Sequence, residues 1–165
     1  MAKLAEIDRR WVFLCVAVAL MTALVFPFRQ RFTPAPTVRS VHEYIESLPE
    51  GSAVLIGCDY DPQARAEVVP MTQVLLKHCF QKNLRVIGMT FWVEGVPLHR
   101  NIFEDVARSY GKVNGRDYVY LGWRPGGYAQ VLTALGDDSF VNTFENDARD
   151  RPTATMPIFQ DIKTL

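Results

Sequence analysis

Residues 52–62 read "SAVLIGCDYDP", a short apolar run that ends in two aspartates one residue apart. A continuous apolar run of this length, followed by turn residues, predicts a buried strand of a parallel sheet. Asp59 and Asp61 would then follow the carboxyl end of the strand, where open α/β sheets bind their ligands. The stretch therefore predicts an α/β fold. It leaves two interpretations of the aspartates, as catalytic residues or as residues that turn the chain after the strand.

The segments around this stretch alternate between strand and helix patterns. A helix is predicted within 37–51, where the apolar residues share one face and His42 points away from them as a solvated residue. Further strands are predicted at 84–92 and 116–123, and helices at 67–83, 97–112 and 126–138. Three successive βα units imply a parallel sheet with right-handed crossovers, so residues 38–144 are expected to form a small Rossmann-like α/β domain.

Residues 145–165 are polar and proline-containing at first and mildly apolar later. They are predicted to be a C-terminal tail that runs over a surface. A sheet of only three strands would leave an open edge, and such an edge needs a cover. A partner protein is one expected cover.

An uncharged apolar run, "WVFLCVAVALMTALVFPF", occupies residues 11–28. Eighteen residues of helix are about 27 Å long, close to the thickness of the hydrocarbon core of a bilayer. Aromatic residues stand at its ends and arginines flank it, as in a membrane-interface belt. These anchor residues are Trp11, Phe28, Arg9, Arg10 and Arg29.

The run is therefore predicted to be a single transmembrane helix in contact with the lipid bilayer of a bacterial inner membrane. A cleaved signal peptide would need small residues after the apolar core, and a buried core helix would show a polar face; neither is present. Residues 1–10 form the N-terminal tail, and 29–37 form a linker stiffened by Pro34 and Pro36. The flanking charges are nearly balanced, and the two adjacent arginines before the run favour a cytoplasmic N-terminal segment and a domain on the outer side.

Composition argues against nucleic-acid binding and against a metal or cofactor site. Lys plus Arg and Asp plus Glu both number 18 in the 165 residues, and beyond Phe28 there are 15 basic and 16 acidic residues. Without a basic excess, we expect no nucleic-acid partner. The three cysteines and three histidines are scattered, so the sequence predicts no metal site and no cofactor, with Cys58 and Cys79 as buried thiols.

The D-Y-D stretch resembles the D-x-D motif of haloacid-dehalogenase-type phosphatases. The resemblance implies Asp59 as nucleophile, Asp61 as acid/base, Thr90 and Lys112 as supporting residues, and a magnesium ion nearby. Two further aspartates, Asp137 and Asp138, follow in the family's order. Pro62, however, directly follows the second aspartate, at a position where the motif needs conformational freedom. Asp137 and Asp138 end a helix-like run, whereas the late acidic pair of the family ends a buried strand. A strand-to-helix turn is the favoured interpretation of the two aspartates.

The "WRPGG" loop at 123–127 is the other candidate site. Gly126 and Gly127 at a helix start could present backbone N–H groups to an anion, with Arg124 beside them. No P-loop or dinucleotide fingerprint accompanies the glycines, so a tight connection is the favoured interpretation.

Four stretches together resemble uncharacterised bacterial membrane-anchored proteins with a Rossmann-like extramembrane domain. They are "VHEYIESLPEGSAVLIGCDYDP", "LRVIGMTFW", "DYVYLGWRPGG" and "MPIFQDIKTL". The resemblance implies fold and location but no activity. We therefore expect a non-enzymatic, single-span protein whose α/β domain docks on, or stabilises, other subunits of a membrane complex. A membrane-tethered magnesium-dependent phosphohydrolase that uses Asp59 is the alternative.

Overall fold

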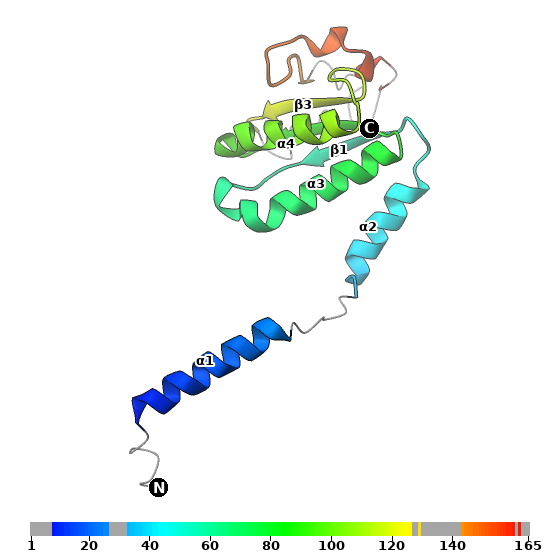
Figure 1. Ribbon diagram of the computed structural model, residues 1–165. Coiled ribbons are helices and arrows are strands. Elements are labelled where there is room, and N and C mark those ends of the chain that lie inside the picture. Colours follow the sequence, from blue (N-terminus) through cyan, green and yellow to red (C-terminus); the bar gives the residue numbers. More distant parts are fainter. Residues whose placement is uncertain (1–7, 27–32, 127–128, 130–142, 161, 163–165) are drawn as a thin grey trace. The chain divides into compact units, whose positions relative to one another are not determined.

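A computed structural model describes residues 8–26, 33–126, 129, 143–160 and 162. The chain divides into two compact units, Met1–Arg39 and Ser40–Leu165. The first unit contains the helix α1, Arg9–Val25, and the second contains an α/β domain (Figure 1).

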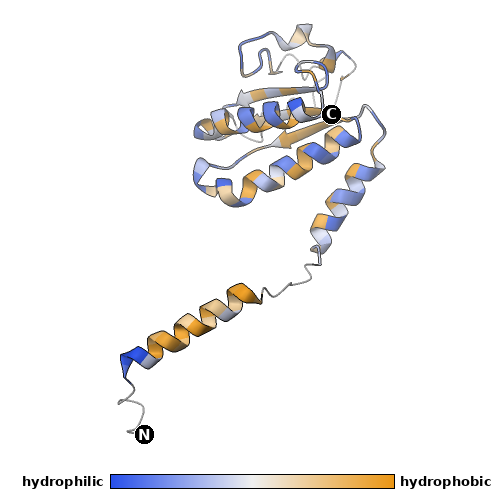
Figure 2. Cartoon of the chain, viewed as in Figure 1, coloured by the Kyte–Doolittle hydropathy of each residue, from blue (hydrophilic) through white to orange (hydrophobic). Residues whose placement is uncertain are grey.

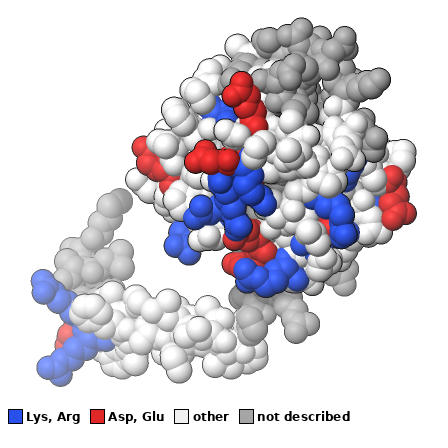
Figure 3. Space-filling model, turned by 90° about the horizontal axis from the view of Figure 1, so that it is seen from above, with Lys and Arg blue, Asp and Glu red and all other residues white. Residues whose placement is uncertain are grey.

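Helix α1 is apolar on every side and has no buried residue (Figure 2). It begins at Asp8, whose carboxylate accepts a hydrogen bond from the Arg10 backbone N–H at 3.0 Å. Charged side chains lie at this end of the helix and the rest of its surface is uncharged (Figure 3). Uniform apolarity distinguishes α1 from a surface helix, which keeps one polar face.

The transmembrane helix predicted over residues 11–28 is not supported by the structure. No helix within the described residues is both long enough and apolar enough to cross a membrane. Helix α1 has 17 residues, two of them the arginines at its start, and it ends at Val25. Pro27, Phe28 and Arg29 lie outside the described residues.

The domain is built on three strands that pair in parallel, as predicted, and the structure shows them in the order β1-β2-β3. Each strand coincides with one of the predicted apolar runs. A strand of a parallel sheet is buried on both faces, so nearly all of its residues are apolar. The strands are β1 Ala53–Gly57, β2 Arg85–Thr90 and β3 Tyr118–Trp123, and the helices are α2 Pro36–Ser47, α3 Arg65–Gln81 and α4 Val96–Ser109. The helix predicted at 126–138 falls outside the described residues except for Gly126 and Ala129.

Helices α3 and α4 pack side by side on one face of the sheet (Figure 1). Alternate strand residues point to this face, as the two-residue period of a strand requires. Val86, Tyr118 and Tyr120 belong to the same buried cluster as Phe80 of α3 and Phe103 of α4. Helix α2 joins this cluster through Ile45, which is buried.

The opposite face of the sheet is covered by the C-terminal segment, residues 144–162 (Figure 1). The strand residues that point away from α3 and α4 pack on this opposite face against buried side chains of the C-terminal segment. The cluster contains Ile87, Met89, Val119, Leu121, Phe144, Met156, Ile158, Phe159 and Ile162. The Ile158 N–H donates to the Gly115 carbonyl at 3.0 Å, and the Arg85 side chain donates to the Ile158 carbonyl at 3.0 Å.

This packing differs from the surface tail predicted for residues 145–165. The segment is part of the core of the domain, and it supplies the second layer that a three-stranded sheet needs. Short 3-10 turns carry it, η4 Thr153–Thr155 and η5 Pro157–Phe159. Such turns give no long hydrophobic period, which is why the sequence did not reveal the layer.

Candidate functional site

The loop after β1 uses both aspartates of the D-Y-D stretch to bond the backbone. One carboxylate oxygen of Asp59 accepts from the Phe91 N–H at 2.8 Å, which ties the loop after β1 to the end of β2. Asp61 accepts from the N–H groups of Gln63 and Ala64 at 2.9 and 3.0 Å. Asp61 is thus the N-cap of the 3-10 turn η2, Pro62–Ala64, with Pro62 in its first position.

Thr90 lies beside this loop, at the carboxyl end of β2. Its side chain is fully buried, and its hydroxyl donates to the Cys58 carbonyl at 2.8 Å. The same hydroxyl accepts from the Trp92 N–H at 3.0 Å. The structure therefore brings Asp59 and Thr90 to one edge of the sheet, where both hold the backbone between β1 and β2.

Lys112 lies at the other edge of the sheet. It follows α4, and its ammonium group donates to the Asn83 side-chain oxygen at 2.7 Å; Asn83 stands just before β2. Residues before a parallel strand lie at the amino edge, so Lys112 is separated from Asp59 by the length of the strands. The structure does not assemble the phosphatase set at one place, and Asp137 and Asp138 lie outside the described residues.

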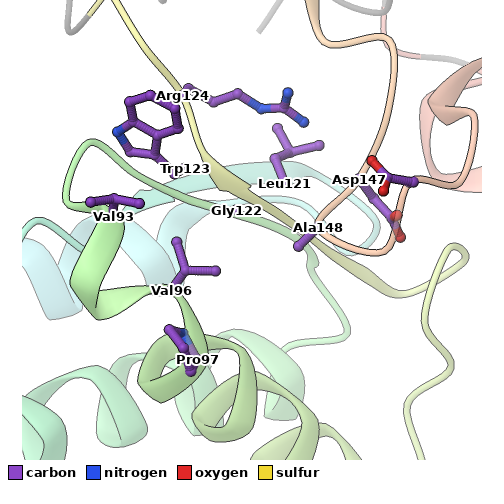
Figure 4. A pocket seen from close by; sticks show the side chains of 10 residues that line it. Val93, Val96, Pro97, Leu121, Gly122, Trp123, Arg124, Asp147 and Ala148 are labelled. Carbon is purple, nitrogen blue, oxygen red and sulfur yellow. The ribbon is translucent and has the colours of Figure 1, made fainter.

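An open groove of about 430 Å³ occupies the carboxyl edge, between β3, the start of α4 and the turn at 147–150 (Figure 4). Its walls are largely apolar, and Trp123 and Val93 are exposed at it, 46% and 52% respectively. The lining residues are Val93, Val96, Pro97, Leu121, Gly122, Trp123, Arg124, Asp147, Ala148 and Asp150. This groove lies at the predicted ligand edge, and of its lining residues the sequence proposed only Arg124 as a site residue.

Arg124 extends above Leu121 toward the chain segment that carries Asp147 (Figure 4). Its guanidinium donates to the Asn146 carbonyl and lies over the Phe144 ring, 5.6 Å from the centroid. Burial lowers the pKa of Arg124, and nearby Asp147 opposes this shift. The Nε atom is buried without a hydrogen-bond partner among the described residues. The guanidinium thus anchors the C-terminal segment, and its Nε retains unused donor capacity.

Of the two glycines predicted to bind an anion, Gly126 has φ of 98°, a left-handed value that favours glycine, and Gly127 lies outside the described residues. The required conformation accounts for Gly126 as a turn residue. The structure places Arg124 and Gly126 in one loop without showing an anion cradle.

Asp147 is the groove residue that sequence reasoning missed. It is buried, and it accepts from the backbone N–H groups of Arg149 and Arg151 at 2.8 and 2.9 Å and from the Arg151 side chain at 2.8 Å. Burial raises its pKa, but these hydrogen bonds outweigh burial and hold the pKa below its ordinary value. The signal was the "NDARDR" run, in which an aspartate precedes arginines at turn spacing.

Behind the D-Y-D loop lies a buried histidine, His99 of α4. Its ring contacts the Tyr60 ring at a centroid distance of 4.3 Å, and its Nδ1 lies 3.3 Å from the Tyr120 hydroxyl. Burial lowers the pKa of His99, and the Tyr60 carbonyl and Asp59 oppose the shift only in part. Burial likewise raises the pKa of the Cys58 thiol to about 12, with Asp59 adding to the effect. Burial thus favours the neutral forms of the His99 imidazole and the Cys58 thiol.

A second cluster lies away from the groove, on α2 and α3. His42, Glu46 and His78 approach one another closely, with their ligand atoms all within 4.8 Å. The sequence predicted a solvated His42 and scattered histidines, because 36 positions separate His42 from His78. The missed signal was the H-x-x-x-E spacing of residues 42 and 46, which places both on one helical face.

The resemblance to membrane-anchored Rossmann-like proteins rests on stretches that form α2, β1, β2 and β3 and part of the C-terminal segment. A parallel α/β sheet agrees with that resemblance in architecture, but many unrelated activities share this architecture. No protein-family model, curated protein or solved structure matches the chain, so the family assignment stays a prediction.

Proposed function

We propose that the protein is a membrane-attached, non-enzymatic subunit whose α/β domain docks on or stabilises another protein of a bacterial inner-membrane complex. The observation that carries the proposal is the exposed apolar surface of α1. Its large side chains face outward all around the helix, with Phe13 72% and Leu24 77% exposed. Moving one such side chain from water into an apolar environment is favourable by about 1.5–3 kcal/mol, so α1 is more stable in an apolar environment than in water.

Lipid is the environment that suits α1 best. A helix that is apolar all round is found in a protein core or in a membrane, and α1 has no buried residue in this chain. The sequence stays uncharged beyond the helix, from Val25 to Phe28, and Arg29 follows. Residues 11–28 would thus contact the bilayer, with arginines on both sides at the headgroups. We propose the outer side for the domain, because the adjacent arginines Arg9 and Arg10 precede the apolar run.

The groove at the carboxyl edge is the proposed docking surface of the domain. Trp123 is 46% exposed there, and Arg124 lies between the apolar wall and the C-terminal segment. Tryptophan and arginine are enriched among the residues that contribute most to protein–protein binding. The described residues of the phosphatase set are divided between two edges, which favours docking over chemistry.

Membrane attachment is tested by reconstituting the full chain with phospholipid vesicles and floating them on a density gradient after an alkaline carbonate wash. Wild type should float with the vesicles. Val16→Lys with Leu20→Lys places two charges on α1 and should leave the protein in the aqueous fraction. The matched control, Met71→Lys with Val74→Lys, makes the same change at exposed positions of α3 and should float. Wild type released by carbonate would contradict the proposal.

Docking is tested by extracting the tagged protein from native membranes in a mild detergent and identifying what co-purifies. One protein should accompany wild type in constant ratio and should be lost from Trp123→Ala. Tyr44→Ala removes an aromatic residue that is 67% exposed on α2 and should retain the partner. Recovery of monomer alone would rule out the docking role.

A membrane-tethered phosphohydrolase is the second candidate, because Asp59 and Thr90 do meet at the carboxyl edge. It requires magnesium-dependent release of phosphate by the full chain that Asp59→Asn abolishes and Lys82→Met does not. Equal release by wild type and Asp59→Asn across a panel of phosphate esters would exclude it.

A further inference from the structure

We infer that His42, Glu46 and His78 form a zinc site that joins α2 to α3. The inference is independent of the proposed membrane role. His42 and Glu46 lie one turn apart on α2, and His78 lies in the last turn of α3. Two imidazoles and one carboxylate are the donor set of zinc sites that keep a fourth position for water.

The distances suit a metal with little rearrangement. The Nε2 atom of His78 lies 2.7 Å from a carboxylate oxygen of Glu46, and all three ligand atoms fall within 4.8 Å of one another. Zinc bonds nitrogen and oxygen at about 2.0–2.2 Å, so tetrahedral ligands stand about 3.3–3.5 Å apart. Small side-chain rotations would open the His78–Glu46 contact and bring the His42 nitrogen inward.

The two histidine rings stack at a centroid distance of 4.6 Å with an angle of 27° between their planes. The stacking brings the two rings close enough to share one metal ion, which would bind both as neutral imidazoles. Lys82 donates to the Glu46 carbonyl at 3.0 Å and lies 3.5 Å from the second carboxylate oxygen. Lys82 opposes a cation by its charge, but it also orients Glu46, as outer partners of metal ligands do.

The helices that carry the three ligands are held in place by buried neighbouring side chains. Ile45, between the two ligands of α2, is buried in the core with 4% of its surface exposed. Cys79, next to His78, is fully buried. The two ligands of α2 and the one ligand of α3 therefore project from helices whose neighbouring side chains are held in the core, which is the support that a metal site needs. A bound zinc ion would lock α2, the helix that leads out of the linker, against the domain.

The experiment uses the full chain in detergent, purified by a tag that contains no histidine, in a Cys15→Ser background because Cys15 is exposed. Zinc affinity is measured by competition with a chromogenic chelator at neutral pH. Wild type should bind one zinc ion per chain. Glu46→Gln and His78→Ala should each weaken binding by more than about 100-fold, because loss of a direct ligand exceeds the loss caused by an outer partner.

Glu43→Gln is the matched control, since Glu43 is exposed on the same helix and the change removes the same charge. It should bind zinc as tightly as the background protein. Zinc should raise the unfolding midpoint of the background protein and of Glu43→Gln, and of neither ligand variant. Cobalt in place of zinc should give the visible absorption of a four-coordinate site.

Circular dichroism without metal shows whether each variant is folded. If His78→Ala is unfolded, His42→Ala decides, because His42 is exposed and its removal leaves the core intact. Absence of one-to-one binding by the background protein, or binding that persists undiminished in the ligand variants, would overturn the zinc site.

Discussion

At Gly88 a side chain of any size would collide with α4. A Cβ at this position of β2 would lie 2.3 Å from the Phe103 ring and 2.9 Å from the Tyr120 ring. We expect Gly88→Ala to lower the free energy of unfolding by about 1–3 kcal/mol, since overpacking displaces well-packed rings. Urea denaturation measures the loss, and Phe103→Leu in the same chain should recover part of it. An unchanged midpoint for Gly88→Ala would mean that α4 is not held this close to β2.

Asp147 makes the free energy of unfolding of the domain depend on pH in the acid range. Its pKa is raised by burial but lowered further by hydrogen bonds from Arg151 and from the backbone of Arg149, so it lies below the ordinary value. The folded state then binds fewer protons than the unfolded state, and the stabilisation is complete above the unfolded pKa of about 3.9. It is lost as the pH falls through the lower native pKa.

We therefore expect Asp147→Asn to cost about 1–3 kcal/mol of unfolding free energy at neutral pH, and much less in strong acid where wild type is itself protonated. Urea denaturation at the two pH values measures the difference. Asp150→Asn, at the exposed end of the same turn, should cost little at either pH. A loss of equal size at both pH values would contradict the role of the charge.

At the scale of elements, the C-terminal segment is the second cover of the sheet, and Ile158 is its central contact, fully buried. We expect Ile158→Ala to cost about 2–5 kcal/mol, the range for a core residue reduced to alanine. Val113→Ala, at a half-exposed position before β3, should cost far less. Urea denaturation compares the two. Similar small losses at both sites would indicate that the segment lies loosely on the sheet.

The elements that could be predicted from the sequence are those with a strong period. The three apolar runs became β1, β2 and β3, and α3 continues through Pro70, which lies inside the helix and removes one intrahelical hydrogen bond. The C-terminal layer escaped prediction because its core residues are spaced irregularly through 3-10 turns. In the site, Asp59 was placed correctly at the carboxyl edge, whereas Asp147 reaches that edge from a distant segment.

Lys112 shows the limit of reasoning from residue order alone. It follows Asp59 and Thr90 along the chain as the phosphatase pattern requires, yet it precedes β3 instead of ending a strand, and so lies at the amino edge. The histidine cluster escaped prediction for the opposite reason, since packing of α2 on α3 brings together residues that are far apart in sequence.

For the whole molecule, the division at Arg39 predicts that the domain folds without α1. Helix α1 has no buried residue, so its removal deprives the core of nothing. We expect a chain lacking residues 1–35 to unfold cooperatively, with the same urea midpoint as the full chain in the same detergent. A truncated chain that unfolds without a cooperative transition would show that the first unit supports the second.

Cover of the sheet by residues 144–162 also sets the order in which the domain is completed during synthesis. Strand β3 leaves the ribosome with Ile87, Met89, Val119 and Leu121 still bare on one face. More than twenty further residues must emerge, after those held in the exit tunnel, before Phe144 and Ile158 reach that face. Throughout this interval α1 is already outside the ribosome and free to meet a membrane. If α1 inserts as proposed above, insertion of the first unit would precede closure of the second, and the sheet of the nascent chain would at that stage be covered on one face only.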